Sequence, residues 1–249
     1  FRTSVNISVG CDKECTYCIV PSTRGDEISI PPEMIVSQIQ KAVDNGVVEV
    51  ALLGQNVNSY GKRFSNNADK YSFTQLLQDI SKIDGLKRIR FTSPHPLHMD
   101  DEFIEEFARN PKISKCIHMP LQSGSTKILK AMKRGYTKEW FLNRAFKMRE
   151  LIPDLRITTD IIVAFPGETN EDFLDTLDVV NQVKFDQIFN FKYSPRPNTK
   201  ALELKDLEIE DSIGSARLDE LIELHKRYLE KSMPDRIGKT VNVLVESLK

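Results

Sequence analysis

The stretch that decides the fold is GCDKECTYCIVPSTRG, residues Gly10–Gly25, which holds Cys11, Cys15 and Cys18, three of the four cysteines in the chain. Thiolates spaced as C-x3-C-x2-C on a loop are metal ligands far more often than disulfide partners or packing residues. Three protein ligands leave one coordination position of a metal centre free. The sequence therefore predicts a metal site that is open to a further ligand.

Two kinds of metal site are compatible with three clustered thiolates. A zinc site would need a fourth ligand, such as Cys116 or a histidine. An iron–sulfur cluster is held by three thiolates with one iron left open to substrate. We expect the cluster, and we expect Cys116 to be a core residue on a strand. A non-catalytic, zinc-bound RNA-interaction module stays open as the alternative.

Composition restricts the class of protein. The 249 residues are 40% hydrophobic, which is enough for the core of one large domain. The net charge of −1 gives no overall positive charge that would indicate binding to nucleic acid. Four cysteines, three of them clustered, suit a reducing compartment. No apolar run approaches the roughly 18 residues of a membrane span, and we expect no signal peptide. We expect a cytoplasmic protein that has no membrane partner and is a monomer.

The order of the expected elements predicts an α/β fold. Six expected strands alternate with helices: Thr3–Val9, Val47–Leu53, Lys87–Phe91, Lys115–Met119, Arg156–Ala164 and Gln187–Tyr193. Parallel strands need a long crossover, usually a helix, so this alternation indicates parallel β/α units. Six units are too few for the usual eight-stranded barrel. We therefore expect a partial (β/α)6 barrel, followed by a long helix over about Glu208–Lys231.

Several expected strands have one polar and one apolar face. The polar faces carry Asn6, Ser8, Arg88, Arg90, Asn190 and Lys192. The apolar faces carry Val5, Ile7, Ile89, Phe91, Phe189 and Phe191. We expect the apolar face to pack on the helices and the polar face to line a ligand-filled interior, with a solvated sheet face as the alternative. Arg88, Arg90, Asn190 and Lys192 are thus candidates for substrate contact.

Polar turns follow the expected strands at their carboxyl ends. In parallel α/β folds ligands bind at this edge. The cysteine loop follows the first strand, and three further turns follow later strands: Gly54-Gln55-Asn56, Gln122-Ser123-Gly124 and Phe165-Pro166-Gly167-Glu168. The sequence therefore places these four segments around one site.

The motifs resemble a known family. The cysteine array, with Tyr17 just before Cys18, resembles the radical S-adenosylmethionine (SAM) enzymes. Six stretches look like the methylthiotransferases of that group: CTYCIVPSTRG (15–25), LLGQNVNSYG (52–61), MPLQSGS (119–125), LKAMKRGYT (129–137), TDIIVAFPGET (159–169) and SPRPNT (194–199). The second of these looks like the branch that modifies tRNA. The resemblance covers about residues 1–231.

The resemblance implies a reaction and its cofactors. A 4Fe-4S cluster on Cys11, Cys15 and Cys18 would bind SAM at its open iron and cleave it to a 5′-deoxyadenosyl radical. The radical would act on N6-isopentenyladenosine at tRNA position 37, next to the anticodon, and a methylthio group would be installed. A flavodoxin-type reductant would supply electrons. Threonylcarbamoyladenosine in tRNA, or a ribosomal protein, stays open as the substrate.

The resemblance also suggests SAM contacts, while no residue is assigned a catalytic role. Tyr17 would offer its backbone to adenine or pack the loop; Gly54, Gln55 and Asn56 would meet the methionyl amino group or form a turn. Gln122 and Ser123 are ribose candidates, and Arg134 would clamp a carboxylate or phosphate or act at a helix end. Phe165 would line the adenine site. Arg24 is an uncertain substrate candidate, while His95 and His98 are expected to be turn and surface residues.

One departure from the family pattern is large. Methylthiotransferases carry an N-terminal domain with three further cysteines for an auxiliary 4Fe-4S cluster, whereas only Cys116 remains here after the triad. The chain begins and ends inside expected strands. We therefore expect a piece of a longer protein: a radical SAM core over residues 1–232 and the truncated start of a TRAM-like β domain over 233–249. Such a fragment would not complete sulfur transfer.

Overall fold

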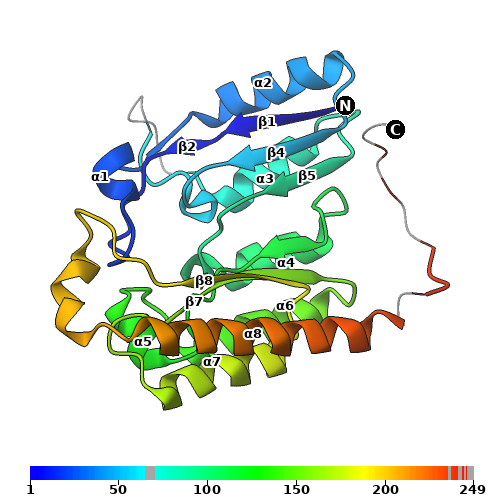
Figure 1. The fold of residues 1–249 in the computed structure, drawn as a ribbon. Helices are drawn as coiled ribbons and strands as arrows, with labels where there is room; N and C mark the ends of the chain where they lie inside the picture. Colours follow the sequence, from blue (N-terminus) through cyan, green and yellow to red (C-terminus); the bar gives the residue numbers. More distant parts are fainter. Residues whose placement is uncertain (65–70, 235–236, 241–242, 244, 246–249) are drawn as a thin grey trace.

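The computed structural model describes residues 1–64, 71–234, 237–240, 243 and 245, and its six parallel strands form two three-stranded sheets (Figure 1). The first sheet has the order β1-β4-β5, with β1 (Arg2–Asn6), β4 (Glu49–Leu53) and β5 (Arg88–Phe91). The second has the order β6-β7-β8, with β6 (Cys116–His118), β7 (Arg156–Val163) and β8 (Gln187–Lys192). The expected partial α/β barrel is confirmed, and the strand expected over residues 240–246 lies largely outside the described residues.

The two sheets meet at a narrow seam between β5 and the segment before β6. Among the described residues, Ile89 and Ile113 form an isolated parallel bridge here. The Ile89 amide donates to the Lys112 carbonyl at 2.7 Å, and the Ser114 amide donates to the Ile89 carbonyl at 2.9 Å. By contrast, β7 and β8 are paired over six residues. The two sheets are therefore joined by few backbone hydrogen bonds, while helices that follow each half meet across the seam through the Lys147–Asp101 ion pair.

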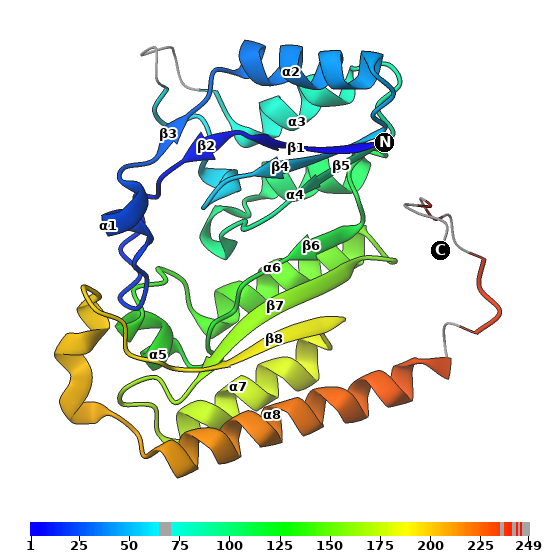
Figure 2. The same ribbon diagram turned by 45° about the horizontal axis from the view of Figure 1, so that its top comes forward.

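Helices cover the outer faces of both sheets (Figures 1 and 2). They are α2 (Pro32–Asp44), α3 (Phe73–Ser81), α4 (Asp101–Arg109), α5 (Thr126–Ala131), α6 (Lys138–Leu151), α7 (Asn170–Val183) and α8 (Asp211–Ser232). Short 3-10 turns are η1 (Val57–Ser59), η2 (Pro96–His98) and η3 (Lys200–Leu207). Apolar side chains such as Ile39, Leu52 and Phe103 form one core between helices and strands. No helix in the described part of the chain is both long and apolar enough to cross a bilayer.

The first expected strand is broken where the cysteine loop begins. Arg2–Asn6 forms β1, but β2 (Ser8–Val9) leaves the sheet and pairs antiparallel with β3 (Ile28–Ser29). This pair brings the two ends of the cysteine loop together. The loop itself contains the short helix α1 (Val20–Arg24).

The predicted orientation of β8 is wrong. The Nζ of Lys192 donates to Asp211 Oδ1 at 2.6 Å and to Ser215 Oγ at 3.1 Å, so its side chain lies on the α8 side of the sheet. The Oδ1 of Asn190, which shares that face, is buried without a hydrogen-bond partner. Phe189 and Phe191 are instead 43% and 50% exposed and line the interior cavity. The cause is α8, which covers the polar face of β8 and leaves its aromatic face to the interior.

Candidate active site

The cysteine loop is closed at its base by backbone contacts. Gly10 has a φ of +80°, and a Cβ there would lie 1.9 Å from the Asp26 carbonyl oxygen. Its amide donates to Gln55 Oε1 at 2.9 Å, and the Cys11 amide donates to the Gly25 carbonyl at 3.1 Å. Only glycine fits this close approach. The turn after β4 thus fixes the start of the loop through Gln55.

The far side of the loop is bound to the second half of the barrel through Thr16. Its amide donates to the Met132 carbonyl at 3.2 Å, and its hydroxyl donates to the Ala131 carbonyl at 3.0 Å. The Thr16 carbonyl in turn accepts from the Ala201 amide at 2.8 Å. The loop therefore spans both halves of the barrel.

The three cysteines of the loop line one cavity of about 180 Å³. All three are free thiols. Burial raises the pKa of Cys11 and of Cys18 above the ordinary thiol value. The first half of the barrel adds Gln55, Asn56 and His95 to the cavity wall, and the second half adds Gln122, Arg134 and Asp160. The carboxyl ends of both sheets thus meet at this cavity.

Arg134 is the buried cation of the site, with 6% of its surface exposed. Its Nη1 donates to Cys15 Sγ at 3.3 Å, and its Nε donates to the Tyr136 hydroxyl at 3.2 Å. The Tyr136 hydroxyl donates to the Pro120 carbonyl at 2.9 Å. A guanidinium fixed in this way supplies a charged hydrogen-bond donor to the Cys15 sulfur.

Asn56 is the strongest sign of a ligand in the cavity. It is 2% exposed, and neither Nδ2 nor Oδ1 of its amide has a hydrogen-bond partner. Leaving a buried donor and acceptor unpaired costs about 1–3 kcal/mol each. A ligand that offers both an acceptor and a donor would remove this cost. Gly54, two residues before Asn56, leaves room for Ser8, whose Oγ would lie 2.6 Å from a Cβ at that position.

The other residues predicted to contact SAM differ in whether they line the cysteine cavity. Gln122 and Tyr17 line the cavity. Ser123 is fully buried and faces α7, where its Oγ lies 3.5 Å from Thr176 Oγ1. Phe165 is also fully buried, in a small core with Met132, and its ring centroid lies 6.5 Å from that of Tyr17. Neither Ser123 nor Phe165 is among the residues that line the cavity.

A larger cavity of about 770 Å³ adjoins the first, and the two share Ser93, His118 and Asp160. The Nε2 of His118 lies 3.1 Å from Asp160 Oδ2, and its Nδ1 lies 2.9 Å from Thr158 Oγ1. The His118 and Phe189 ring centroids are 5.9 Å apart. This cavity is the interior of the partial barrel, and it has both polar and aromatic walls.

The predicted substrate arginines have different positions. Arg90 lines the interior, and its Nη1 is 3.9 Å from Glu49 Oε1. Arg88 pairs with the same buried carboxylate at 3.0 Å, near the amino ends of the strands. Arg24 lies exposed at the end of α1 and is not among the residues that line either cavity. Glu168, in the turn after β7, is buried and pairs with Arg217 of α8 at 2.8 Å.

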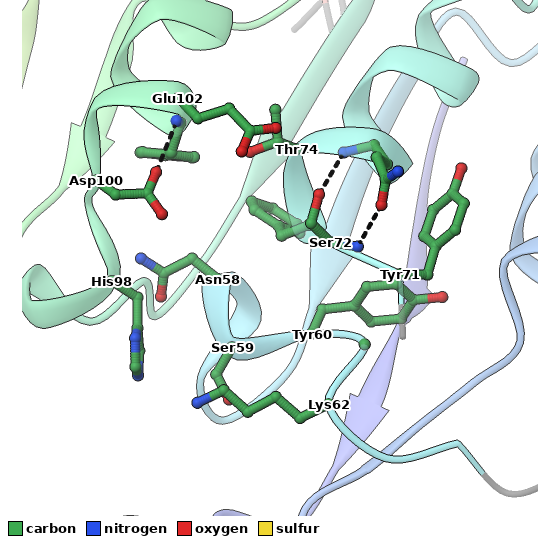
Figure 3. A pocket seen from close by; sticks show the side chains of 14 residues that line it. Asn58, Ser59, Tyr60, Lys62, Tyr71, Ser72, Thr74, His98, Asp100 and Glu102 are labelled. Carbon is green, nitrogen blue, oxygen red and sulfur yellow. Dashed lines mark hydrogen bonds between the residues drawn. The ribbon is translucent and has the colours of Figure 1, made fainter. Parts of the chain in front are cut away.

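A further cavity, of about 620 Å³, lies between η1 and the starts of α3 and α4 (Figure 3). Its helix ends are already capped, because Ser72 Oγ accepts from the Gln75 amide at 3.1 Å and Asp100 Oδ1 accepts from the Phe103 amide at 2.9 Å. No cysteine lines it. The chemistry of the chain is therefore concentrated at the cysteine cavity.

Sequence reasoning missed several residues of the site, of which Asp160 and His95 are instructive. Asp160 alternates with buried Thr159 and Ile161 on β7, so alternation was a usable signal for an inward position. His95 was expected at the surface but is 6% exposed and lines the cysteine cavity. It follows β5 in an irregular segment, where no periodicity indicates direction.

Residues 5–180 match the Radical SAM superfamily. The chain belongs to the radical SAM superfamily. Family membership implies a 4Fe-4S cluster and SAM as cofactors. The three thiols and the unpaired amide of Asn56 fit these groups.

Two bacterial proteins are similar to this chain over its whole length. The chain is 81% identical over all its 249 residues to tRNA-2-methylthio-N(6)-dimethylallyladenosine synthase from Aliarcobacter butzleri, and spans 57% of that protein. It is 59% identical to the enzyme of the same name from Campylobacter jejuni, again over 57% of its length. This radical SAM chain thus spans little more than half the length of these relatives.

Solved structures of radical SAM enzymes share the fold. The methyltransferase TsrM from Kitasatospora setae aligns with a TM-score of 0.64 and 16% identity, over 80% of this chain and 38% of TsrM. Coproporphyrinogen III oxidase from Escherichia coli aligns with a TM-score of 0.59 and 14% identity, over 90% of this chain and 52% of the oxidase. At these identities the likeness concerns the fold alone.

Two kinds of metal group could use the three thiols. A zinc ion would draw its thiolates to about 2.3 Å. Within the described ranges, no three His, Cys, Asp or Glu side chains are grouped closely enough for one ion. Three thiolates are also the protein ligands that an iron–sulfur cluster with one open iron uses.

Proposed function

We propose that the protein containing this chain is a tRNA methylthiotransferase that converts N6-isopentenyladenosine at tRNA position 37 to its 2-methylthio derivative. One observation carries the proposal. The cavity shared by Cys11, Cys15 and Cys18 lies in a chain whose whole length is 81% identical to a synthase of that product.

The residues of the cavity have distinct tasks in this proposal. Cys11, Cys15 and Cys18 hold the cluster, and Arg134 stabilises the thiolate of Cys15. Asn56 binds the amino and carboxylate groups of SAM, because its unpaired amide offers both an acceptor and a donor. When bound, the cluster supplies the electron that cleaves SAM reductively. Gln122 lines both the cysteine cavity and a neighbouring cavity of about 320 Å³ that also contains Phe191, where SAM and substrate would meet.

The interior favours the isopentenyl substrate over the alternatives. Phe189 and Phe191 present exposed aromatic faces that suit an apolar five-carbon group. Threonylcarbamoyladenosine would bring a carboxylate, which calls for a free cation. Arg88 and Arg90 instead face the buried carboxylate of Glu49. A ribosomal protein substrate has no comparable support in this cavity.

The remaining parts of the proposal concern the longer protein. Relatives nearly twice as long leave room for further domains. We propose that residues 1–232 act as the radical SAM core and 233–249 begin an RNA-binding β domain. An auxiliary 4Fe-4S cluster elsewhere would provide the sulfur, and a flavodoxin-type protein would provide electrons. The enzyme would act as a monomer on tRNA in the cytoplasm.

Mass spectrometry of tRNA tests the proposal. Cells that lack the full-length protein should accumulate isopentenyladenosine without its methylthio group, and the wild-type protein should restore the product. A Cys11→Ala, Cys15→Ala, Cys18→Ala triple variant should restore none of it, while Cys116→Ala is the matched control for iron binding. The proposal would be rejected if the triple variant took up as much iron at the site as the wild-type protein. It would also be rejected if the cells lacked the methylthio group on a nucleoside other than isopentenyladenosine.

A further inference from the structure

His95 presents an unused hydrogen-bond donor to the cysteine cavity. The residue follows β5, is 6% exposed and lines the cavity with the three cysteines. Its Nε2 is buried and has no hydrogen-bond partner. A buried, unpaired donor beside a ligand cavity costs free energy unless the ligand accepts from it.

The imidazole is held in one orientation. Both backbone polar groups of His95 bind the Asn58 side chain, whose Oδ1 accepts from the His95 amide at 2.7 Å and whose Nδ2 donates to its carbonyl at 3.0 Å. The Leu97 amide donates to His95 Nδ1 at 3.2 Å. The ring also packs edge-on against Tyr136, with centroids 5.7 Å apart. Because Nδ1 accepts, the proton of the neutral ring is on Nε2, which is the atom without a partner.

The surroundings of His95 keep its ring neutral and favour an anionic ligand. Burial, and then the charges of Arg134 and Lys13, lower the pKa of His95 to about 2. Lys13 and Arg134 line the same cavity. The ligand group at this wall must accept a hydrogen bond, and the local positive charge favours one that is negative.

We propose that His95 Nε2–H donates a hydrogen bond to an anionic acceptor on the group that occupies the cysteine cavity. The inference rests on the proposed function, since that function supplies the two possible acceptors. One is a sulfur of the cluster and the other is the carboxylate of SAM. In either case His95 is a binding residue of the site, supported by Asn58 through the backbone of the turn.

Two substitutions separate the two roles of the His95 side chain, the donor to the cavity and the acceptor in the turn. In His95→Asn, Oδ1 takes the place of Nδ1, so the Leu97 amide keeps its acceptor while the donor in the cavity is lost. In His95→Gln, Nε2 takes the place of the imidazole Nε2, so the donor is kept while the acceptor of the turn is lost. The full-length protein is reconstituted anaerobically with iron and sulfide. The relevant cluster is identified as the signal that disappears in the triple cysteine variant.

Two measurements distinguish the acceptors. If the acceptor is a cluster sulfur, His95→Asn lowers the reduction potential before SAM is added, and a tenfold change in the redox ratio corresponds to about 59 mV for one electron. If the acceptor is the SAM carboxylate, the potential is unchanged and the SAM dissociation constant rises about tenfold or more, as expected for a hydrogen bond to a charged group. His95→Gln changes neither the redox ratio of the cluster nor the SAM dissociation constant by more than about twofold relative to the wild type.

Three results would overturn the inference. In the first, neither variant changes the reduction potential or the SAM dissociation constant. In the second, both variants change these quantities equally. In the third, only His95→Gln changes them, which would reveal a role of His95 in the turn alone. These results differ from a failure of the proposed function, in which the wild-type protein itself would not bind the cluster and SAM.

Discussion

Arg134 Nη1 donates a hydrogen bond to Cys15 Sγ at 3.3 Å, across 119 positions of sequence. Arg134 follows α5 in the second half of the barrel, whereas Cys15 lies on a loop that starts from the first half. If Cys15 holds a cluster as proposed, a buried cation next to its sulfur would stabilise the more negative state of that cluster. The contact would then connect the packing of the second half to the electronic properties of the metal site.

Replacing Arg134 by Gln tests this connection. We expect a lower cluster reduction potential and a loss of about 1.5–3 kcal/mol in the unfolding free energy of the metal-free protein, the usual range for a hydrogen bond to a charged group. Lys133→Gln is the matched control, because Lys133 forms a solvent-exposed ion pair with Glu14, which contributes little to stability. Potentiometry and denaturant titration measure the two effects. Equal changes in both variants would contradict the assigned role.

Phe189 and Phe191 should determine whether the isopentenyl group is bound. Phe189→Asp and Phe191→Asp place charge on the apolar wall, so we expect tRNA methylthiolation to fall by about tenfold or more, at 1–3 kcal/mol for the lost apolar contact. Cleavage of SAM without tRNA should continue. Phe146→Asp is the control, since Phe146 is equally exposed on α6, outside the barrel. Normal methylthiolation in both interior variants would refute this substrate position.

Asp172 should make stability depend on acid pH. Burial raises the pKa of Asp172, but hydrogen bonds from Lys127, Ser125 and Thr169 outweigh burial and lower it to about 2. A carboxyl group with a depressed pKa stabilises the fold at pH values above its ordinary pKa. This stabilisation is lost as the pH falls towards 2. Asp172→Asn should therefore cost about 2 kcal/mol at pH 7, at 1.36 kcal/mol per pKa unit.

The cost of Asp172→Asn should shrink as the metal-free protein is titrated from about pH 4 to pH 2. Denaturant unfolding at several pH values measures it. Asp178→Asn, on the exposed side of the same helix, is the control and should have a smaller effect. A cost that does not depend on pH would show that the pKa of Asp172 is not depressed in the folded state.

Gly124 and Gly54 should differ in their tolerance of a methyl group. A Cβ at Gly124 would lie 2.5 Å from the backbone of α7, at Thr176 Cα, whereas a Cβ at Gly54 would meet the Ser8 hydroxyl, which can rotate away. We expect Gly124→Ala to cost about 3 kcal/mol and Gly54→Ala about 1 kcal/mol, the two ends of the range for overpacking. Thermal unfolding compares them. The reverse order would show that Gly54 has the less adaptable surroundings.

Much of the fold and the centre of the candidate site follow from local patterns. The six strands are found where alternation and turn residues predict them, because each strand is bounded by a helix and must bury its apolar face. The cysteine spacing also predicts the cavity, since a short loop keeps the three thiols together whatever surrounds it. These features depend on neighbours in sequence.

The missed features depend on partners far away in sequence. The face of β8 was assigned wrongly because Lys192 lies over Gly214 and reaches Asp211 of α8, a helix that begins 19 residues later. The aliphatic stem of a lysine can pack on a helix while its charge finds a carboxylate. The direction of His95 is set by Asn58, 37 residues earlier. No periodicity in either segment carries this information.

The narrow seam between the two sheets has a mechanical consequence for the metal-free protein. The wall of the cysteine cavity comes from both halves, which are connected at one edge by the Ile89–Ile113 bridge and at the opposite end by Thr16 and Arg134. A cluster held by Cys11, Cys15 and Cys18 would rigidify the cysteine loop, which contacts the first half through Gln55 and the second half through Thr16 and Arg134. Cluster loading should then slow amide exchange at Ile89 and Ser114, so the seam reports from a distance on whether the metal site is filled.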